Sequence, residues 1–296
     1  MTPMDMALID LLQSSPIVFT AIATILGLLI GSFLNVVIHR LPVMMERQWR
    51  AEHAQMNGAE AETTPQGKYN LVVPRSRCPQ CGHAITALEN IPVLSYLALR
   101  GKCSQCGARI SARYPVVEIL TAVVSCAVAW RFGFGWQTGA ALLLSWALIA
   151  LTFIDIDHYL LPDSITLPVL WAGLLLSLYG VFVDSHASII GAAAGYLSLW
   201  SVYKGFKWLT GREGMGYGDF KLLAVLGAWL GWQALPAVIL LSSLVGAVTG
   251  IAMILLRGRD KNIPIPFGPY LAAAGWIALM WGENITRVYM GMAGLG

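Results

Sequence analysis

Long apolar runs alternate with short polar breaks along most of the chain. The first run covers residues 16–38, and apolar runs resume after a polar stretch from 40 to 113. A run of about twenty apolar residues is long enough to cross a bilayer as a helix. The pattern therefore predicts an all-α polytopic membrane protein of about eight spans, the later seven near 116–131, 137–154, 165–183, 188–209, 220–232, 235–256 and 268–281.

Composition supports the bilayer as the environment of the chain. Of its 296 residues, 57% are hydrophobic and 12% are charged, which is about half the charged fraction of a soluble domain. Asp5 and Asp10, and no basic residue, precede the first run, whereas a cleaved secretory signal has positive charge in front. We therefore expect a permanent first span with its N-terminus outside the cytoplasm.

Positive charge marks the loops that are expected to face the cytoplasm. Ten of the nineteen Lys and Arg residues lie between 40 and 113, and most others lie in 204–221 and 257–261. Cytoplasmic loops of membrane proteins carry such an excess, so both termini are predicted outside, with only Arg131 and Arg287 near the outer face. The net charge of +3, placed in this way, indicates membrane lipid rather than nucleic acid as a partner.

The polar stretch divides the chain into three predicted parts. We expect a first transmembrane helix within 1–39, a cytoplasmic loop at 40–115 and a seven-helix membrane core at 116–296. The loop is the only segment long enough to fold as a small soluble module. It also contains four of the five cysteines.

These four cysteines form two Cys-x-x-Cys-Gly units, Cys78 with Cys81 and Cys103 with Cys106. Each turn places two thiolates within reach of one tetrahedral ion, which is typical of a structural zinc site. Two disulfides are the alternative, but the cytoplasm keeps thiols reduced; His83 is an alternative ligand. Four thiolates leave no open position for water, so the predicted Zn²⁺ would fold the loop rather than perform chemistry.

Acidic residues stand at the predicted cytoplasmic ends of two spans. Asp155 directly follows the third apolar run, and Asp219 opens the sixth within Gly216-Tyr-Gly-Asp219. Ionisable groups at this depth are costly and are candidates for function. Two neighbouring carboxylates share one proton, which leaves one as base and the other as acid for activating water. We therefore predict that Asp155 and Asp219 are a catalytic pair that hydrolyses a peptide bond.

Other interpretations of these residues stay open. Asp157 is the main alternative to Asp155, whereas Asp163 is typical of a helix cap for the fourth span. A capping role is also open for Asp219, and Lys221 is expected to meet lipid head groups. The same two acids would also suit a proton- or ion-coupled transporter, and the cysteine loop would suit a non-catalytic assembly scaffold.

Several motifs point together to one family. They are the string Gly31-Ser-Phe-Leu-Asn-Val-Val-Ile-His-Arg-Leu-Pro42, both cysteine pairs, the stretch 155–163 and Gly216-Tyr-Gly-Asp219. Together they resemble the bacterial type IV prepilin peptidases, intramembrane aspartyl proteases of the G-x-G-D type that are also prepilin leader peptidase/N-methyltransferases. The resemblance runs from Gly31 to about Gly275 and depends on no single motif. It implies that Asp155 and Asp219 are the catalytic aspartates.

The resemblance also implies a substrate, a second activity and a location. Such enzymes cleave the leader of prepilins or pseudopilins at the cytoplasmic face of the bacterial inner membrane, and then methylate the new N-terminus. S-adenosyl-L-methionine would be the methyl donor, and the cysteine loop would be needed for activity. No Gly-rich loop of the dinucleotide type is visible, so the residues that hold the donor are unknown. By position Glu89, Asn90 and the stretch 31–42 are candidates, and each has an equally simple structural reading.

Overall fold

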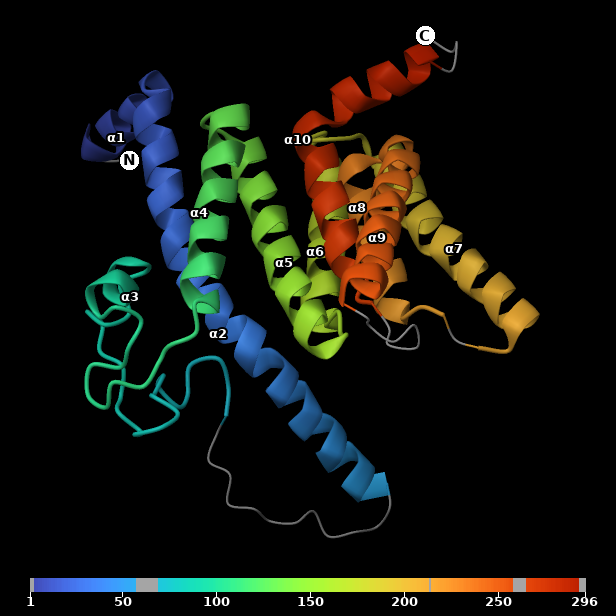
Figure 1. Ribbon diagram of the computed structural model, residues 1–296. Helices are drawn as coiled ribbons and strands as arrows, with labels where there is room; N and C mark the ends of the chain where they lie inside the picture. The colour runs from blue at the N-terminus through green and yellow to red at the C-terminus, as the bar shows by residue number, and fades with distance from the viewer. Residues whose placement is uncertain (1–2, 57–68, 213, 258–264, 293–296) are drawn as a thin grey trace. The chain divides into compact units, whose positions relative to one another are not determined.

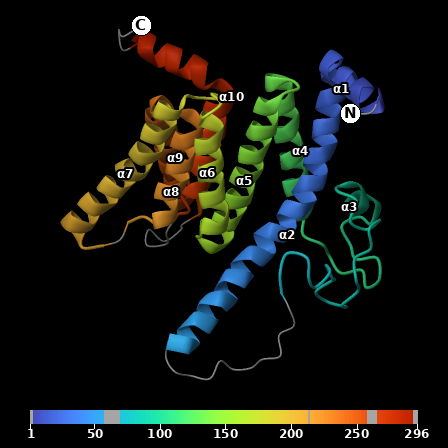
Figure 2. The same cartoon turned by 180° about the vertical axis from the view of Figure 1, so that it is seen from behind.

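The computed structural model describes residues 3–56, 69–212, 214–257 and 265–292 (Figures 1 and 2). Within these residues the secondary structure is helical, and extended pairing is limited to two isolated bridges, Arg77 with Ala84 and Lys102 with Arg109. The cysteine-bearing segment lies between the first two membrane helices. The predicted fold class is therefore confirmed. The chain divides into two compact units, Met1–Phe134 and Gly135–Gly296.

The N-terminal unit contains α1 (Pro3–Ser14), α2 (Pro16–Met56), α3 (Leu94–Ala98) and α4 (Arg113–Phe132). The predicted first span, 16–38, is only the beginning of α2, which continues through Pro42 for 41 residues in all. At 1.5 Å per residue α2 is about 61 Å long, roughly twice the thickness of a bilayer core. Side-chain pairs one turn apart support the polar half, because Glu46 binds Arg50 at 2.5 Å and Gln48 binds Glu52 at 3.0 Å.

Small residues let α2 and α4 approach closely. A Cβ atom added to Gly27 would lie 2.6 Å from the Ser125 hydroxyl oxygen, and one added to Gly31 would lie 2.7 Å from the Glu118 Cα. Glycines four residues apart are a common contact between membrane helices, where close packing replaces the hydrophobic effect. The helix pair therefore has one well-defined face of contact.

The C-terminal unit contains seven further elements. They are α5 (Trp136–His158), α6 (Asp163–Ser177), α7 (Ser185–Thr210), α8 (Tyr217–Leu230), a 3-10 turn η1 (Trp232–Ala234), α9 (Leu235–Arg257) and α10 (Gly268–Met292). Helix α8 is the core of this unit, since Phe220, Leu222, Leu223, Leu226 and Trp229 are almost fully buried. Its Trp229 indole N–H donates to the Val169 carbonyl of α6 at 2.8 Å, and its Ala228 carbonyl accepts from Ser188 of α7 at 2.6 Å.

The apolar runs predict most helix positions well. Within the described residues, four helices are long and apolar enough to cross a membrane: α2, α4, α5 and the continuous helix Trp232–Leu256. The remaining predicted spans fall on α6, α7, α8 and α10, and the count of eight stays a prediction. Helix α6 ends at Ser177, six residues before the predicted end of that span at 183. Gly231, with φ of 78°, and the η1 turn separate the sixth and seventh predicted spans.

Candidate active site and metal centre

Asp155 lies in the last turn of α5, where the helix is about to end. The chain leaves α5 at Tyr159, which has a left-handed backbone with φ of 55° and donates its N–H to the Asp155 carbonyl at 3.0 Å. The Asp155 side chain is buried, with 6% of the residue exposed, and its Oδ2 accepts the Gly268 N–H at 3.0 Å. Because Gly268 is the first residue of α10, this bond joins the end of one helix to the start of another.

Asp219 lies in the first turn of α8 and is 8% exposed. The backbone amide of Gly216, the residue before the helix, is a partner of its carboxyl group. Because the N-cap of α8 is Gly216, Asp219 is not the N-cap residue; its carboxyl group instead reaches back to the N-cap N–H, as the third residue of a capping box does. The negative charge of Asp155 also acts on the Asp219 carboxyl group. A residue that only capped the helix would not need a second carboxylate nearby.

Leu161 lies close to a glycine beside each of the two aspartates, Gly218 near Asp219 and Gly268 near Asp155. A Cβ atom added to Gly218, next to Asp219, would lie 2.8 Å from the Leu161 Cβ. One added to Gly268 would lie 2.7 Å from Asp155 Oδ2 and 3.2 Å from Leu161 Cδ2. The structure therefore brings Asp155 and Asp219 to one buried place, with the α5–α6 linker packed between their glycine neighbours.

The other acidic residues of the first cluster lie outside this place. Asp157 is exposed on α5. Asp163 is the first residue of α6, whose N-cap is Pro162, so the predicted capping role of Asp163 is wrong. Both of its carboxylate oxygens accept from the Lys221 Nζ at 2.7 Å. The contact of Lys221 with lipid head groups stays a prediction. The ion pair was not indicated by the sequence, because its two partners are 58 positions apart.

The four cysteines of the predicted metal site come together in the N-terminal unit. Their Sγ atoms all lie within 4.8 Å of one another, with 3.8 Å between Cys78 and Cys106 and 3.9 Å between Cys81 and Cys103. All four are free thiols in this structure. Corners of a tetrahedron drawn around Zn²⁺ with bonds of about 2.3 Å are about 3.8 Å apart. The spacing of the sulfurs therefore fits one tetrahedral ion.

The two cysteine turns have the same local structure. Cys78 N–H donates to His83 O and Gly82 N–H to Cys78 O, while Cys103 N–H donates to Ala108 O and Gly107 N–H to Cys103 O, all within 2.8–3.0 Å. Gly82 and Gly107 take left-handed backbones, with φ of 72° and 70°. Backbone N–H groups of Cys81 and Gln80 lower the pKa of the Cys78 thiol to about 6, and those of Cys106 and Gln105 lower the pKa of Cys103. The backbone thus favours the thiolate of the first cysteine in each turn, whereas desolvation and the neighbouring thiols raise the pKa of Cys81 to about 12.

Glu89 bridges the two cysteine turns. Its carboxylate accepts from the Thr86 N–H at 2.8 Å, the Thr86 hydroxyl at 2.9 Å and the Ser104 hydroxyl. Both oxygens also lie 3.2 Å from Nε2 of His83. These hydrogen bonds, that of Ser104 first, lower the Glu89 pKa to about 2. Glu89 is therefore a tightly bonded structural residue, while its neighbour Asn90 is exposed.

The stretch 31–42 is mostly engaged in packing and structural hydrogen bonds. Asn35 donates to the carbonyls of Gly31 at 3.3 Å and Tyr114 at 3.0 Å. Arg40 is 8% exposed and donates to the Asn70 carbonyl at 3.0 Å.

Sequence reasoning missed Glu118, a carboxylate in α4 that is 8% exposed and accepts the Val93 N–H at 2.8 Å. The sequence signal that could have identified Glu118 is an acidic residue inside an apolar run.

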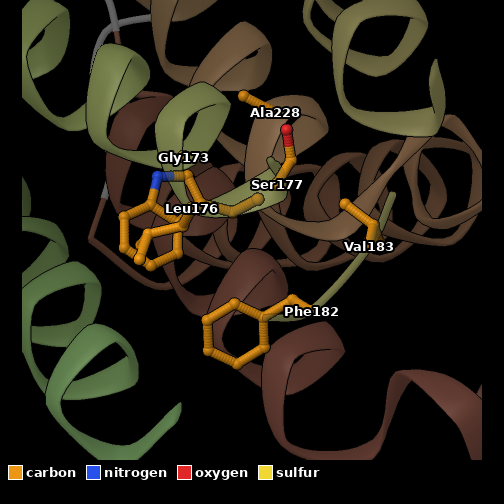
Figure 3. Close-up of a pocket in the computed structure, with 7 residues that line it drawn as sticks. Gly173, Leu176, Ser177, Phe182, Val183 and Ala228 are labelled. Atoms are coloured by element: carbon orange, nitrogen blue, oxygen red, sulfur yellow. The ribbon is translucent and has the colours of Figure 1, made fainter. Parts of the chain in front are cut away.

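A shallow hollow in the C-terminal unit lies away from the aspartates. It is lined by apolar groups and one hydroxyl (Figure 3), from Gly173, Leu176, Ser177, Phe182, Val183, Ala228 and Trp229. Ala228 is nine residues beyond Asp219 on α8, about 13 Å along the helix. With no ionisable lining residue, the hollow offers no group for acid–base chemistry.

Comparison with known proteins identifies the family. Residues 25–132 match the bacterial peptidase A24 N-terminal domain, and residues 142–251 match the type IV leader peptidase family. A prepilin leader peptidase/N-methyltransferase from Aeromonas hydrophila is 62% identical over 96% of this chain and 98% of its own length. The chain belongs to the prepilin leader peptidase/N-methyltransferase family. The predicted resemblance is confirmed.

Other members of the family agree along nearly the whole chain. Those from Pseudomonas aeruginosa and Dichelobacter nodosus are 60% and 50% identical, over 98% and 89% of this chain and 99% and 92% of their own lengths. No solved structure matches the chain. The two matched domains fall one in each compact unit, so in this chain the cysteine cluster lies in the A24 N-terminal domain and both aspartates lie in the leader peptidase domain.

Proposed function

We propose that this chain cleaves the leader peptide of type IV prepilins or pseudopilins with Asp155 and Asp219, and then N-methylates the new N-terminus. Membership of the family supports both activities. The observation that supports the residue assignment is the burial of two carboxylates, from α5 and α8, beside the same Leu161 linker. No other pair of buried acids occurs in the described part of the C-terminal unit.

Hydrolysis by this pair needs one carboxylate charged and the other protonated. The charged aspartate takes a proton from water as the water oxygen attacks the scissile carbonyl carbon, and the protonated one gives its proton to the departing nitrogen. The Gly268 N–H orients Asp155 and the Gly216 amide orients Asp219. Neither amide carries a charge, so the two carboxylates keep their tendency to share a proton.

Asparagine substitutions test the catalytic assignment. Asp155→Asn and Asp219→Asn should each lower leader removal by roughly 100-fold or more, because each loses proton transfer. Asp157→Asn is the matched control on the same helix and should stay active, since Asp157 is exposed. Purified protein would be incubated with a prepilin-like peptide, and cleavage would be read from product mass. Loss of activity in Asp157→Asn with retention in Asp155→Asn would overturn the assignment.

The same assay separates the proposal from its alternatives. A scaffold would tolerate both asparagine substitutions. A transporter using Asp155 and Asp219 would move protons or ions across vesicles without cleaving the peptide.

The cysteine cluster is proposed to hold one structural Zn²⁺ through Cys78, Cys81, Cys103 and Cys106. The sulfur spacing of 3.8–3.9 Å for two of the pairs supports this assignment. Bound zinc would supply folding energy to the loop. S-adenosyl-L-methionine is the proposed methyl donor, and its binding residues stay unassigned. Adding the donor to the peptide assay should increase the mass of the cleaved product by one methyl group.

The predicted topology and segment boundaries are part of the proposal. Multi-pass insertion in the bacterial inner membrane fits the family and the four long apolar helices. The basic loops, both aspartates and the cysteine cluster are proposed to face the cytoplasm. The division into a first helix, a zinc loop at 40–115 and a peptidase core at 116–296 likewise stays a prediction.

A further inference from the structure

The zinc-binding loop carries leucine side chains that the described protein leaves uncovered. Leu94 and Leu97 of α3 are each 65% exposed. They are three residues apart and therefore lie on the same face of this short helix. Adjacent exposed apolar residues of this kind indicate a surface that contacts another apolar phase or partner.

The start of α3 is held against a membrane helix. The N–H of Val93, the residue before α3, donates to Glu118 Oε2 of α4 at 2.8 Å. Val93 has φ of 61°, a left-handed backbone that is rare for a β-branched residue and costs about 1–3 kcal/mol. Such a conformation persists only where its surroundings fix it. The Ser32 side chain of α2 also hydrogen-bonds to Glu118, so this carboxylate connects the start of α3 to both α2 and α4.

The length of α4 sets the depth of this contact. Helix α4 has 20 residues and is therefore about 30 Å long, which equals the thickness of a bilayer hydrocarbon core. All of α4 is needed to cross, so Arg113 lies at one boundary. Glu118 follows five residues later, about 7.5 Å inside that boundary. Figures 1 and 2 show α3 beside the α2–α4 pair, at the level of the first turns of α4.

We propose that α3 lies in the lipid–water interface, with Leu94 and Leu97 among the acyl chains. Helices that lie flat in a membrane interface bury their apolar face by about 5–10 Å, and the depth of Glu118 falls in this range. Arg100 and Lys102 follow α3 and are exposed, so they are available to phosphate groups of anionic lipids. The zinc-binding loop would thus contact the membrane surface directly, in addition to its covalent connections to α2 and α4.

Photochemical cross-linking tests this placement in the full-length protein. A diazirine-bearing amino acid would replace Leu97, and the protein would be reconstituted in mixed phosphatidylethanolamine and phosphatidylglycerol vesicles. Gln105, exposed in the second cysteine turn, is the control position. Irradiation should give lipid adducts by mass at 97 and none at 105. Absence of lipid adducts at 97 in inserted protein, or cross-links there to a second copy of the chain, would overturn the proposal.

Hydroxyl-radical labelling of the unsubstituted protein provides a second test, which does not depend on replacing a residue of α3. In the same vesicles, Leu94 and Leu97 should be oxidised much more slowly than in the unfolded protein, despite their exposure. Met56, which is 78% exposed at the end of α2, should be oxidised as readily as in the unfolded protein. Full oxidation of both leucines would place α3 in water and contradict the proposal.

Discussion

The buried acids of the described chain share one feature at the level of single residues. Asp155, Asp219 and Glu118 each accept a backbone N–H, from Gly268, Gly216 and Val93 respectively. A backbone amide orients a carboxylate without neutralising it as an Arg or Lys would. In the proposed mechanism this keeps the carboxylates of Asp155 and Asp219 in place and leaves them able to share one proton.

Gly268→Ala should damage the orientation of Asp155. The new methyl carbon would lie 2.7 Å from Asp155 Oδ2 and 3.2 Å from Leu161 Cδ2, so the carboxylate has to move. Displacement of a reacting group by about 1 Å costs on the order of 100-fold in rate, and we expect a loss of this size in kcat for leader removal. Gly282→Ala on the same helix is the control, because a Cβ there meets no atom within 4 Å. Equal activity of both variants would show that the Gly268 contact does not position Asp155.

Local sequence predicted both aspartates as site residues because each adjoins an apolar run. It did not reveal their hydrogen-bond partners. Gly268 is 113 positions from Asp155, and Glu118 is 25 positions from Val93, so neither contact leaves a periodic signal. Nor did it reveal the close contact of Gly218 with Leu161, where an added Cβ atom would lie 2.8 Å from the Leu161 Cβ.

Secondary-structure elements acquire their relative positions through a few polar contacts. The linker between α5 and α6 is fixed at both ends, because Tyr159 bonds to the Asp155 carbonyl and Asp163 binds Lys221 of α8. Lys221 follows Asp219 by two residues. The ion pair therefore ties the linker to the helix of the second aspartate.

Breaking this ion pair should slow catalysis without weakening substrate binding. We expect Lys221→Met to lower kcat for leader removal by about tenfold, with KM unchanged, because the spacing of the aspartates changes and the substrate contacts do not. The charge-swapped double variant Asp163→Lys with Lys221→Asp should recover most of the loss. Lys204→Met, at an exposed site on α7, is the control. An increase in KM without recovery in the double variant would mean that the pair binds substrate instead.

The hydrogen bonds of Glu89 lead to a testable prediction about the two cysteine turns. Glu89→Ala removes the acceptor of Ser104, Thr86 and His83, so the two halves of the proposed zinc site lose this connection. We expect bound zinc to pass to a competing chelator roughly tenfold faster, as followed by the absorbance of the metal–dye complex. Glu52→Ala, exposed on α2, should leave the transfer rate unchanged. No acceleration in Glu89→Ala would show that the turns are held together by the metal alone.

The helix boundaries were predictable where a helix begins or ends at the change between an apolar run and a polar break. Helices α4, α5, α7, α8 and α9 begin and end within a few residues of the predicted spans. The continuation of α2 to Met56 was not predictable in this way, because hydropathy reports the lipid-facing part of a helix and not its polar extension. Its Glu46–Arg50 and Gln48–Glu52 pairs were visible as i, i+4 spacings, which indicate a solvated helix.

At the scale of the whole molecule the two compact units are stabilised differently. The C-terminal unit has an apolar core around α8. The cysteine-bearing segment of the N-terminal unit has little apolar core of its own, since Val72 and Leu88 are each 77% exposed. We therefore expect this segment to need the proposed Zn²⁺ to stay folded. Dependence on zinc should therefore be confined to one unit.

Removal of zinc should unfold the cysteine segment and leave the C-terminal unit intact. Before chelation the four clustered thiols should resist a maleimide, because metal-bound sulfur is a poor nucleophile; after chelation four labels should appear by mass. Cys126, half-buried within α4, is the internal control and should remain unlabelled in vesicles. Limited proteolysis should then cut between 69 and 112 while 135–257 stays protected, because the core around α8 contains no ligand of the metal. Four reactive thiols before chelation would instead show that this segment folds through its hydrogen bonds, with Glu89 and the two glycine turns sufficient to hold the sulfurs together.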